Sequence, residues 1–245
     1  MNESQDISWR RIFAEGAAIV AGILLAFAID AWWDDQVEIK EEQRLLAALA
    51  NEFESNINVL REARTEYEER YLEAALVLEY LESKGVEHDP SRLTELVRNL
   101  FRARTIHLES GAHDALLASG NLNLIRNDEL RIRLAAWPSY VGEWSEEEVA
   151  VFAYVRDVFR PFFSESIRIR SIQPGFPPFV DGQSPREIPT GSLQVSSIVE
   201  ISKSIAFDNL VHQRAQGLWH AMRDGETLLA QATEIERLLR ESLEE

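Results

Sequence analysis

The chain has 245 residues, 45% apolar and 27% charged, so it can bury the core of one domain of fair size. Its net charge of −17 argues against a nucleic-acid partner, because phosphate backbones are bound by clustered Lys and Arg. The absence of cysteine excludes disulfides, thiol catalysis and cysteine-ligated metal sites.

An apolar segment lies near the N-terminus, at residues 12–33. Its length is close to the ~20 residues that a helix needs to cross the hydrocarbon core of a membrane. Trp9 precedes the segment, and Trp32 and Trp33 close it, as is typical of aromatic residues at the two membrane interfaces. We therefore expect this segment to be a transmembrane helix.

The charges that flank the apolar segment predict its orientation. Arg10 and Arg11 precede it, whereas Asp34 and Asp35 follow it. Because positive charge is retained on the cytoplasmic side, we expect the N-terminus to lie in the cytoplasm. The chain then has a cytoplasmic tail at residues 1–11, a transmembrane helix at residues 12–33 and a domain outside the cytoplasm at residues 34–245.

A cleaved signal peptide is the alternative reading of the N-terminus. Ala26 and Ala28 flank Phe27 in a small-x-small pattern that suits a cleavage site. However, the apolar stretch is long for a signal peptide and contains Glu15 in its first turn. We therefore expect the anchor to be retained.

A heptad stripe of mainly apolar residues runs from Ala18 to Leu81 and crosses the expected membrane surface in register. Residues 23–84 contain neither Gly nor Pro. The pattern predicts one helix over residues 12–83, roughly 108 Å long at the helical rise. Such a stripe is also typical of a coiled coil, here between copies of the chain.

A second stripe, of small residues, lies inside the apolar segment. Small-xxx-small spacing lets two helix backbones approach closely, although such residues are also common in transmembrane helices in general. The stripe makes this segment a candidate for association with a second copy or with another membrane protein. Its members are Ala14, Ala18, Gly22 and Ala26.

Glu15 is an acid inside an expected membrane helix. Arg11 lies one turn before it, so the two side chains can pair at the interface with both reaching outwards. The alternative is a functional acid that recognises a partner or senses protons.

Three further helices follow. Asp89 and Pro90 are a typical helix start and predict a helix over residues 90–104. A short helix is expected at residues 113–118, ended by Ser119 and Gly120. Asn127 then caps a helix that runs towards Arg160 with a kink near Pro138, and residues 121–125 connect the two.

Residues 161–197 hold six of the eight prolines, so we expect an irregular insertion there. Ile167 and Ile169, with Leu193 and Val195, alternate with polar residues in a way that fits a small hairpin. The insertion also contains phenylalanines that could cap the bundle or line a binding surface. They are Phe162, Phe163, Phe176 and Phe179.

A last long helix is expected over residues 205–243, with Gly217 and Gly225 as points where it could break. The expected fold class is therefore all-α, with the transmembrane helix continuing into an antiparallel, four-helix-like bundle. No catalytic motif is present, and the histidine spacings, such as Glu109 with His113, give no recognised metal site. We expect no cofactor and no catalytic residues.

Three stretches together resemble an uncharacterised family of bacterial single-pass membrane proteins, a domain of unknown function. The resemblance implies an anchor in the bacterial inner membrane and a helical periplasmic domain, and it implies no activity. Ala28, Asp30 and Ala31 depart from the amide residues expected there. The stretches are Glu15 with Gly22 to Leu24, Ala26, Ile29 and Trp32 or Trp33; Leu45, Leu46, Leu49, Glu52 and Asn56; and Ser119 to Leu122, Leu124, Ile125 and Asn127 to Leu130.

We expect a non-enzymatic membrane-anchored envelope protein that works through protein–protein contacts, as a scaffold or accessory subunit. Self-association is expected, with another membrane protein as a further partner. The alternative is a sensory or ligand-binding helical bundle, whose short cytoplasmic tail would require a partner to carry the signal. An enzyme is the third and least favoured reading, because no catalytic constellation is evident.

Overall fold

The computed structural model describes residues 9–83, 89–103, 105–169, 172 and 195–244, apart from the side chains of residues 9–12 and 14. Every regular element within these ranges is helical, which confirms the all-α class. The α-helices are α1 (Trp9–Glu82), α3 (Pro90–Leu100), α4 (Gly111–Ser119), α5 (Asp128–Tyr154), α6 (Arg160–Ser164), α7 (Val195–Ser202) and α8 (Ile205–Glu244). A 3₁₀ helix, η1 (Asn121–Leu124), follows α4, and a π-helix, η2 (Val155–Phe159), joins α5 to α6.

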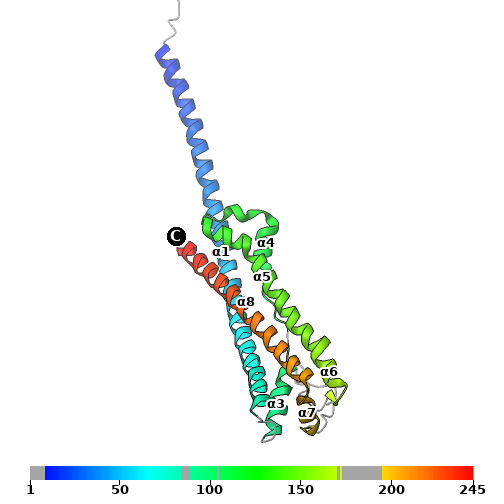
Figure 1. Cartoon of the computed structure of the whole chain (residues 1–245). Coiled ribbons are helices and arrows are strands. Elements are labelled where there is room, and N and C mark those ends of the chain that lie inside the picture. Colours follow the sequence, from blue (N-terminus) through cyan, green and yellow to red (C-terminus); the bar gives the residue numbers. More distant parts are fainter. Residues whose placement is uncertain (1–8, 84–88, 104, 170–171, 173–194, 245) are drawn as a thin grey trace, which may run out of the picture.

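Helix α1 is unbroken from Trp9 to Glu82, as the uninterrupted heptad spacing predicted. Its first half projects from the molecule and its second half belongs to the bundle (Figure 1). The projecting part is long and apolar enough to cross a membrane, and none of its most apolar window is buried. We call the end of the bundle from which this part projects the proximal end, and the opposite end the distal end.

Three long helices, α1, α5 and α8, build the bundle. Helix α8 runs antiparallel to α1 and to α5, and it packs against both (Figure 1). The shorter helices complete the bundle at its two ends, with α4 and η1 beside α1 at the proximal end and α3 and α7 at the distal end. The antiparallel arrangement was expected, but the fourth position is shared by several short helices.

The helix boundaries follow local capping chemistry. The Asp89 carboxylate accepts a hydrogen bond from the backbone N–H of Arg92 at 3.0 Å, which begins α3. The Asn127 side chain accepts from the backbone N–H of Leu130 at 3.0 Å, which begins α5. Gly120 ends α4 with a φ of 72°, a left-handed conformation that glycine adopts without a steric penalty.

The core consists of two clusters of buried side chains. The proximal core includes Leu49, Phe53 and Trp137, with 4.9 Å between the ring centroids of Phe53 and Trp137. The distal core contains a group of packed aromatic rings, in which each neighbouring pair has its centroids 4.9–6.0 Å apart. Its rings are Phe101, Phe159, Phe163 and Phe207.

The heptad stripe is covered by the chain itself over most of its length. Leu46, Phe53, Leu60 and Ala74 are each at most 2% exposed, because the other helices of the bundle pack on them. This part of the stripe is therefore not available for a coiled coil with a second copy. Trp32, in the projecting part, remains 59% exposed.

Three sequence-based expectations differ from the structure. Helix α3 ends at Leu100 rather than at residue 104, and the helix expected to reach Arg160 changes to a π-helix at Val155. Val195 is the first residue of α7, so it does not belong to a hairpin strand. Leu193 lies outside the described residues. Helix α8 is continuous in spite of its two glycines.

The phenylalanines of the insertion divide into two groups. Phe163 is fully buried in the distal core and Phe162 packs against it. These two rings therefore cap the bundle, which was the first of the two alternatives expected from the sequence. Phe176 and Phe179 lie outside the described residues.

Candidate functional site

The proximal end of the bundle holds a group of polar side chains that fasten one segment, residues 105–127, to α1. This segment contains α4 and η1, and both contact α1. Several of its backbone N–H groups donate to side chains of α1 and α5. We call this group of contacts the proximal clasp.

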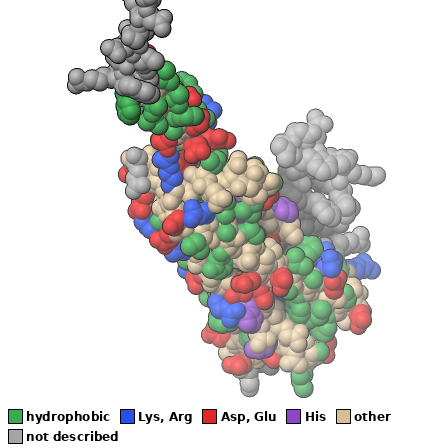
Figure 2. Space-filling model, turned by 90° about the horizontal axis from the view of Figure 1, so that it is seen from above, with side chains coloured by type: hydrophobic (Ala, Val, Ile, Leu, Met, Phe, Trp, Pro, Cys, Tyr) green, Lys and Arg blue, Asp and Glu red, His purple; other side chains and the backbone are tan. Residues whose placement is uncertain are grey.

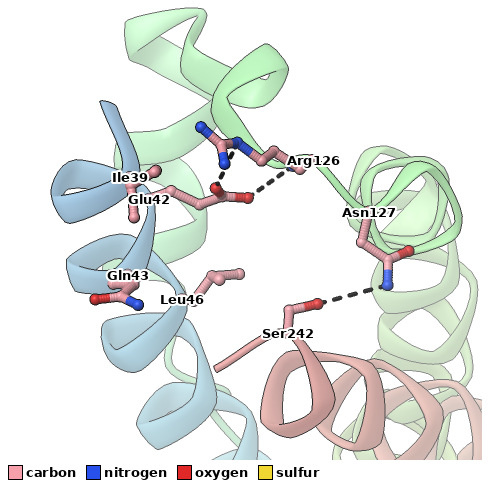
Figure 3. Close-up of a pocket in the computed structure, with 7 residues that line it drawn as sticks. All are labelled: Ile39, Glu42, Gln43, Leu46, Arg126, Asn127 and Ser242. Carbon is pink, nitrogen blue, oxygen red and sulfur yellow. Dashed lines mark hydrogen bonds and ion pairs between the residues drawn. The ribbon is translucent and has the colours of Figure 1, made fainter. Parts of the chain in front are cut away.

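The first contact of the clasp joins Arg126 to α1. The carboxylate of Glu42, which is 8% exposed, accepts from the backbone N–H of Arg126 at 2.7 Å and lies 3.4 Å from its Nε. The other end of the guanidinium donates to Asp35 at 2.8 Å. Asp35 and Glu42 are seven residues apart, two turns along one face of α1, so a single arginine bridges both. Figure 3 shows the guanidinium reaching across to Glu42.

The second contact caps α4 with a side chain from another helix. Glu52 is 6% exposed, and its carboxylate accepts from the backbone N–H groups of Ala112 at 2.6 Å and His113 at 3.2 Å. These groups lie in the first turn of α4, where a negative charge is also favoured by the helix dipole. Ser110, which occupies the usual capping position, instead donates to Asp114 at 2.7 Å.

The third contact is a reciprocal pair between Asn56 and Glu109. The Asn56 Nδ2 donates to the Glu109 carbonyl oxygen at 2.8 Å, and its Oδ1 accepts from the Glu109 backbone N–H at 2.7 Å. An amide can satisfy both backbone groups of one residue in this way because it carries a donor and an acceptor side by side. From the opposite side, Glu148 of α5 accepts from the backbone N–H of Ile106.

His113 and Glu109, which lie four residues apart, contact different groups. The His113 Nε2 lies 2.8 Å from the carbonyl oxygen of Leu134, and its side chain is 2% exposed. The side chain of Glu109 accepts instead from Ser55 at 2.8 Å. Within the described ranges, no cluster of histidine and acidic residues could hold a metal ion.

A pocket of about 320 Å³ opens between α1, Arg126 and the C-terminal turn of α8 (Figure 3). Asn127 closes one side of it, with its Nδ2 3.5 Å from Ser242 Oγ. The carboxylate of Glu42 in its wall is already bonded to Arg126, so this carboxylate serves to join two segments. The lining residues are Ile39, Glu42, Gln43, Leu46, Arg126, Asn127 and Ser242.

The residues expected at a membrane interface and at a helix contact all belong to the projecting part of α1. Glu15, Trp32 and Trp33 are exposed, and the two indole rings meet edge to face with 6.4 Å between their centroids. Ala18, Gly22 and Ala26 are exposed, whereas the side chains of Ala14, Arg10 and Arg11 lie outside the description. Figure 2 shows apolar side chains covering this part of α1 and acidic side chains where it joins the bundle.

Comparison of the chain with protein-family models, with curated proteins and with solved structures finds no match. The family resemblance stated from the sequence therefore remains an expectation. The structure does bring its second and third stretches together, since Glu52 and Asn56 bind the segment that leads to Gly120 and Asn127.

Sequence reasoning identified Asn127 as a helix cap but did not identify Arg126, Glu42 or Glu148 as parts of one clasp. In a chain with 42 acidic residues, a carboxylate at a given position carries little signal. The one available sign was spacing, because Asp35, Glu42, Leu49 and Asn56 repeat every seven residues along α1.

Proposed function

We propose that the chain is a single-pass membrane protein that acts through protein–protein contacts, as a scaffold or accessory subunit in a bacterial envelope. In this proposal residues 12–33 cross the inner membrane, the N-terminus lies in the cytoplasm and the bundle lies in the periplasm. The span associates with a second copy or with another membrane protein. No chemical reaction is assigned to it.

The proposal rests on one observation. Helix α1 is a single helix that contains the apolar segment and also belongs to the bundle. The apolar segment is fully exposed in the isolated chain, so lipid or another helix is needed to cover it. The second half of α1 is buried in the bundle and clasped by Arg126, so a force or rotation in the span passes directly into the bundle. Such a helix suits a protein that holds a partner at a fixed place.

Orientation and retention of the anchor are tested with two measurements on the full chain. A reporter that is active only in the cytoplasm, fused after Glu245, is expected to stay inactive, because the positive charges precede the span. A bright signal contradicts the orientation. The mass of the protein recovered from membranes is expected to equal that of a chain that still contains residues 1–33. A mass that matches a chain starting at residue 29 would show cleavage of a signal peptide after Ala28.

Self-association is tested on the small-residue stripe. Gly22→Leu is expected to lower the oligomer mass in mild detergent, because the bulky side chain separates the helix backbones. Gly16→Leu is the matched control, since Gly16 lies about 120° around the helix from Gly22. A Cβ on either glycine meets nothing within 4 Å in the single chain, so neither change disturbs its fold. An equal effect of both changes, or none, contradicts a contact through the stripe.

A further inference from the structure

The proximal end of the bundle carries an uncharged surface, which we call the proximal tip and define as residues 117–124. The whole stretch from Ala115 to Ile125 has no charged residue, although 27% of the chain is charged. Within the tip, Leu117 is 38% exposed, Leu122 and Leu124 are half-buried, and the remaining residues are exposed Ala, Ser, Gly and Asn. A protein with net charge −17 thus presents a neutral, partly apolar surface at this end.

The proximal clasp fixes this tip at the base of the projecting helix. Arg126, two residues after the tip, binds Asp35 and Glu42. At the helical rise these lie about 3 Å and about 14 Å beyond Trp33, along α1. Figure 3 shows the ribbon that precedes Arg126 on the side away from Leu46, towards the apolar segment. The tip therefore faces the same direction as the span.

The expected membrane surface lies at the level of Asp35, the nearer of these two residues. Trp32 and Trp33 close the apolar segment, and tryptophan side chains prefer the headgroup layer. That layer adds about 5–7 Å to each side of the hydrocarbon core. A surface held just beyond these tryptophans therefore meets lipid headgroups before it meets bulk water.

The chemistry of the tip fits a lipid surface. Acidic side chains of the bundle would be repelled by anionic lipid, so a close approach requires a face without them. Leucine side chains gain free energy from leaving water, and the exposed backbone and amide groups of Asn121 and Asn123 can bond to headgroups and their water. Seen from the side of the span, a patch of tan and green atoms lies beside the base of α1 (Figure 2).

We propose that the proximal tip rests in the headgroup layer of the membrane that the apolar segment crosses, with Leu117, Leu122 and Leu124 as its contact side chains. This inference rests on the proposed function, because it requires the apolar segment to lie in a bilayer. The bundle is then held by two contacts, the span and the tip, and its tilt on the membrane is fixed.

The test uses the full chain, whose lack of cysteine allows single labels to be introduced. Cysteine replaces Leu25 in the span, Asn123 in the tip or Glu68 in the distal part of α1, and each variant carries a polarity-sensitive fluorophore. The three proteins are reconstituted in phosphatidylcholine–phosphatidylethanolamine vesicles with a lipid-borne quencher. We expect quenching at Leu25 and Asn123 that is several-fold greater than at Glu68, which is exposed and far from the tip.

The outcomes separate the two proposals. Quenching at Leu25 without quenching at Asn123 keeps the membrane anchor and overturns the tip contact, and this result also follows if the tip faces another protein. Absence of quenching at Leu25 overturns the anchor itself. As a second readout, Leu117→Glu is expected to reduce quenching at Asn123 and to leave thermal unfolding unchanged, because Leu117 lies at the surface. Unchanged quenching in this variant contradicts the role of the leucines.

Discussion

Arg214 of α8 donates a hydrogen bond through Nη1 to the backbone carbonyl oxygen of Val151 in α5, over 3.2 Å. In a regular α-helix that carbonyl would accept from Val155, but the Val155 N–H donates to Phe152 where the π-helix begins. Through Nη2 the same guanidinium donates to the carbonyl oxygen of Arg102 at 2.8 Å, just beyond α3. A buried arginine therefore satisfies backbone groups at two irregular points in the chain.

Replacement of Arg214 tests this role. Arg214→Ala is expected to lower the free energy of unfolding by about 3 kcal/mol, because it removes a buried, packed side chain and the donor for the buried Val151 carbonyl and the partly buried Arg102 carbonyl. Arg214→Lys is expected to lose less, since it keeps a donor. Chemical denaturation provides the measurement. The control is Arg237→Ala, whose ion pairs with Glu234 and Glu241 are exposed to solvent, so their loss is expected to change stability much less. Similar losses for Arg214 and Arg237 would contradict the assignment.

The ionisation of Tyr154 provides a pH-dependent prediction. Its hydroxyl donates to the Leu210 carbonyl oxygen at 2.8 Å, and partial burial raises its pKa from 10.0 to about 12, while the nearby Arg214 acts in the opposite direction. The folded protein holds this proton at pH values where the unfolded chain has lost it. The contribution of Tyr154 to stability is therefore complete below about pH 10 and is lost as the pH rises towards 12.

Absorbance at the tyrosinate band after a rapid pH jump measures this ionisation before the protein unfolds. The wild-type protein is expected to show a late component near pH 12, and Tyr154→Phe is expected to remove it. Tyr140→Phe serves as the control, because it leaves the Tyr154 hydroxyl in place. If the late component survives in Tyr154→Phe, the hydroxyl environment described above is wrong.

The clasp by Glu52 is tested by amide hydrogen exchange. Glu52→Ala is expected to speed exchange at Ala112 and His113 and to lower the free energy of unfolding by about 1.5–3 kcal/mol, because charge-assisted bonds at a helix N-terminus are lost. Glu54→Ala is the matched control on the same helix, since Glu54 makes an exposed ion pair with Arg240. The idea fails if the two amides exchange at the same rate in both variants.

The two glycines inside α8 provide a comparison within one helix. A Cβ on Gly217 would lie 3.6 Å from Val151, an ordinary contact, so Gly217→Ala is expected to stabilise the protein by about 0.5–1 kcal/mol through helix propensity. A Cβ on Gly225 would lie 3.2 Å from Nε1 of Trp144, whose buried ring must move. Gly225→Ala should therefore stabilise the protein less than Gly217→Ala, or destabilise it. The melting temperatures of the two variants provide the measurement. A larger gain at Gly225 would show that the ring moves freely.

The sequence by itself determined the long helices and several helix ends, although it did not predict α7. The continuity of α1 follows from an unbroken heptad spacing without Gly or Pro, and Asp89, Asn127 and Gly120 mark three boundaries. These features depend on residues within one or two turns of each other. Local sequence therefore carries the information that decides them.

Only the tertiary structure decided what covers the apolar face of each helix. An apolar stripe is the same whether a second copy or the chain's own helices bury it, because the hydrophobic effect has no direction. The structure places Leu46, Phe53 and Leu60 inside their own bundle. Likewise, Glu52 caps a helix some 60 residues away, and Arg214 fills a gap made by an irregular turn in another helix. These roles of Glu52 and Arg214 arise only when segments far apart in the sequence meet. The spacing of residues along the chain therefore does not predict them.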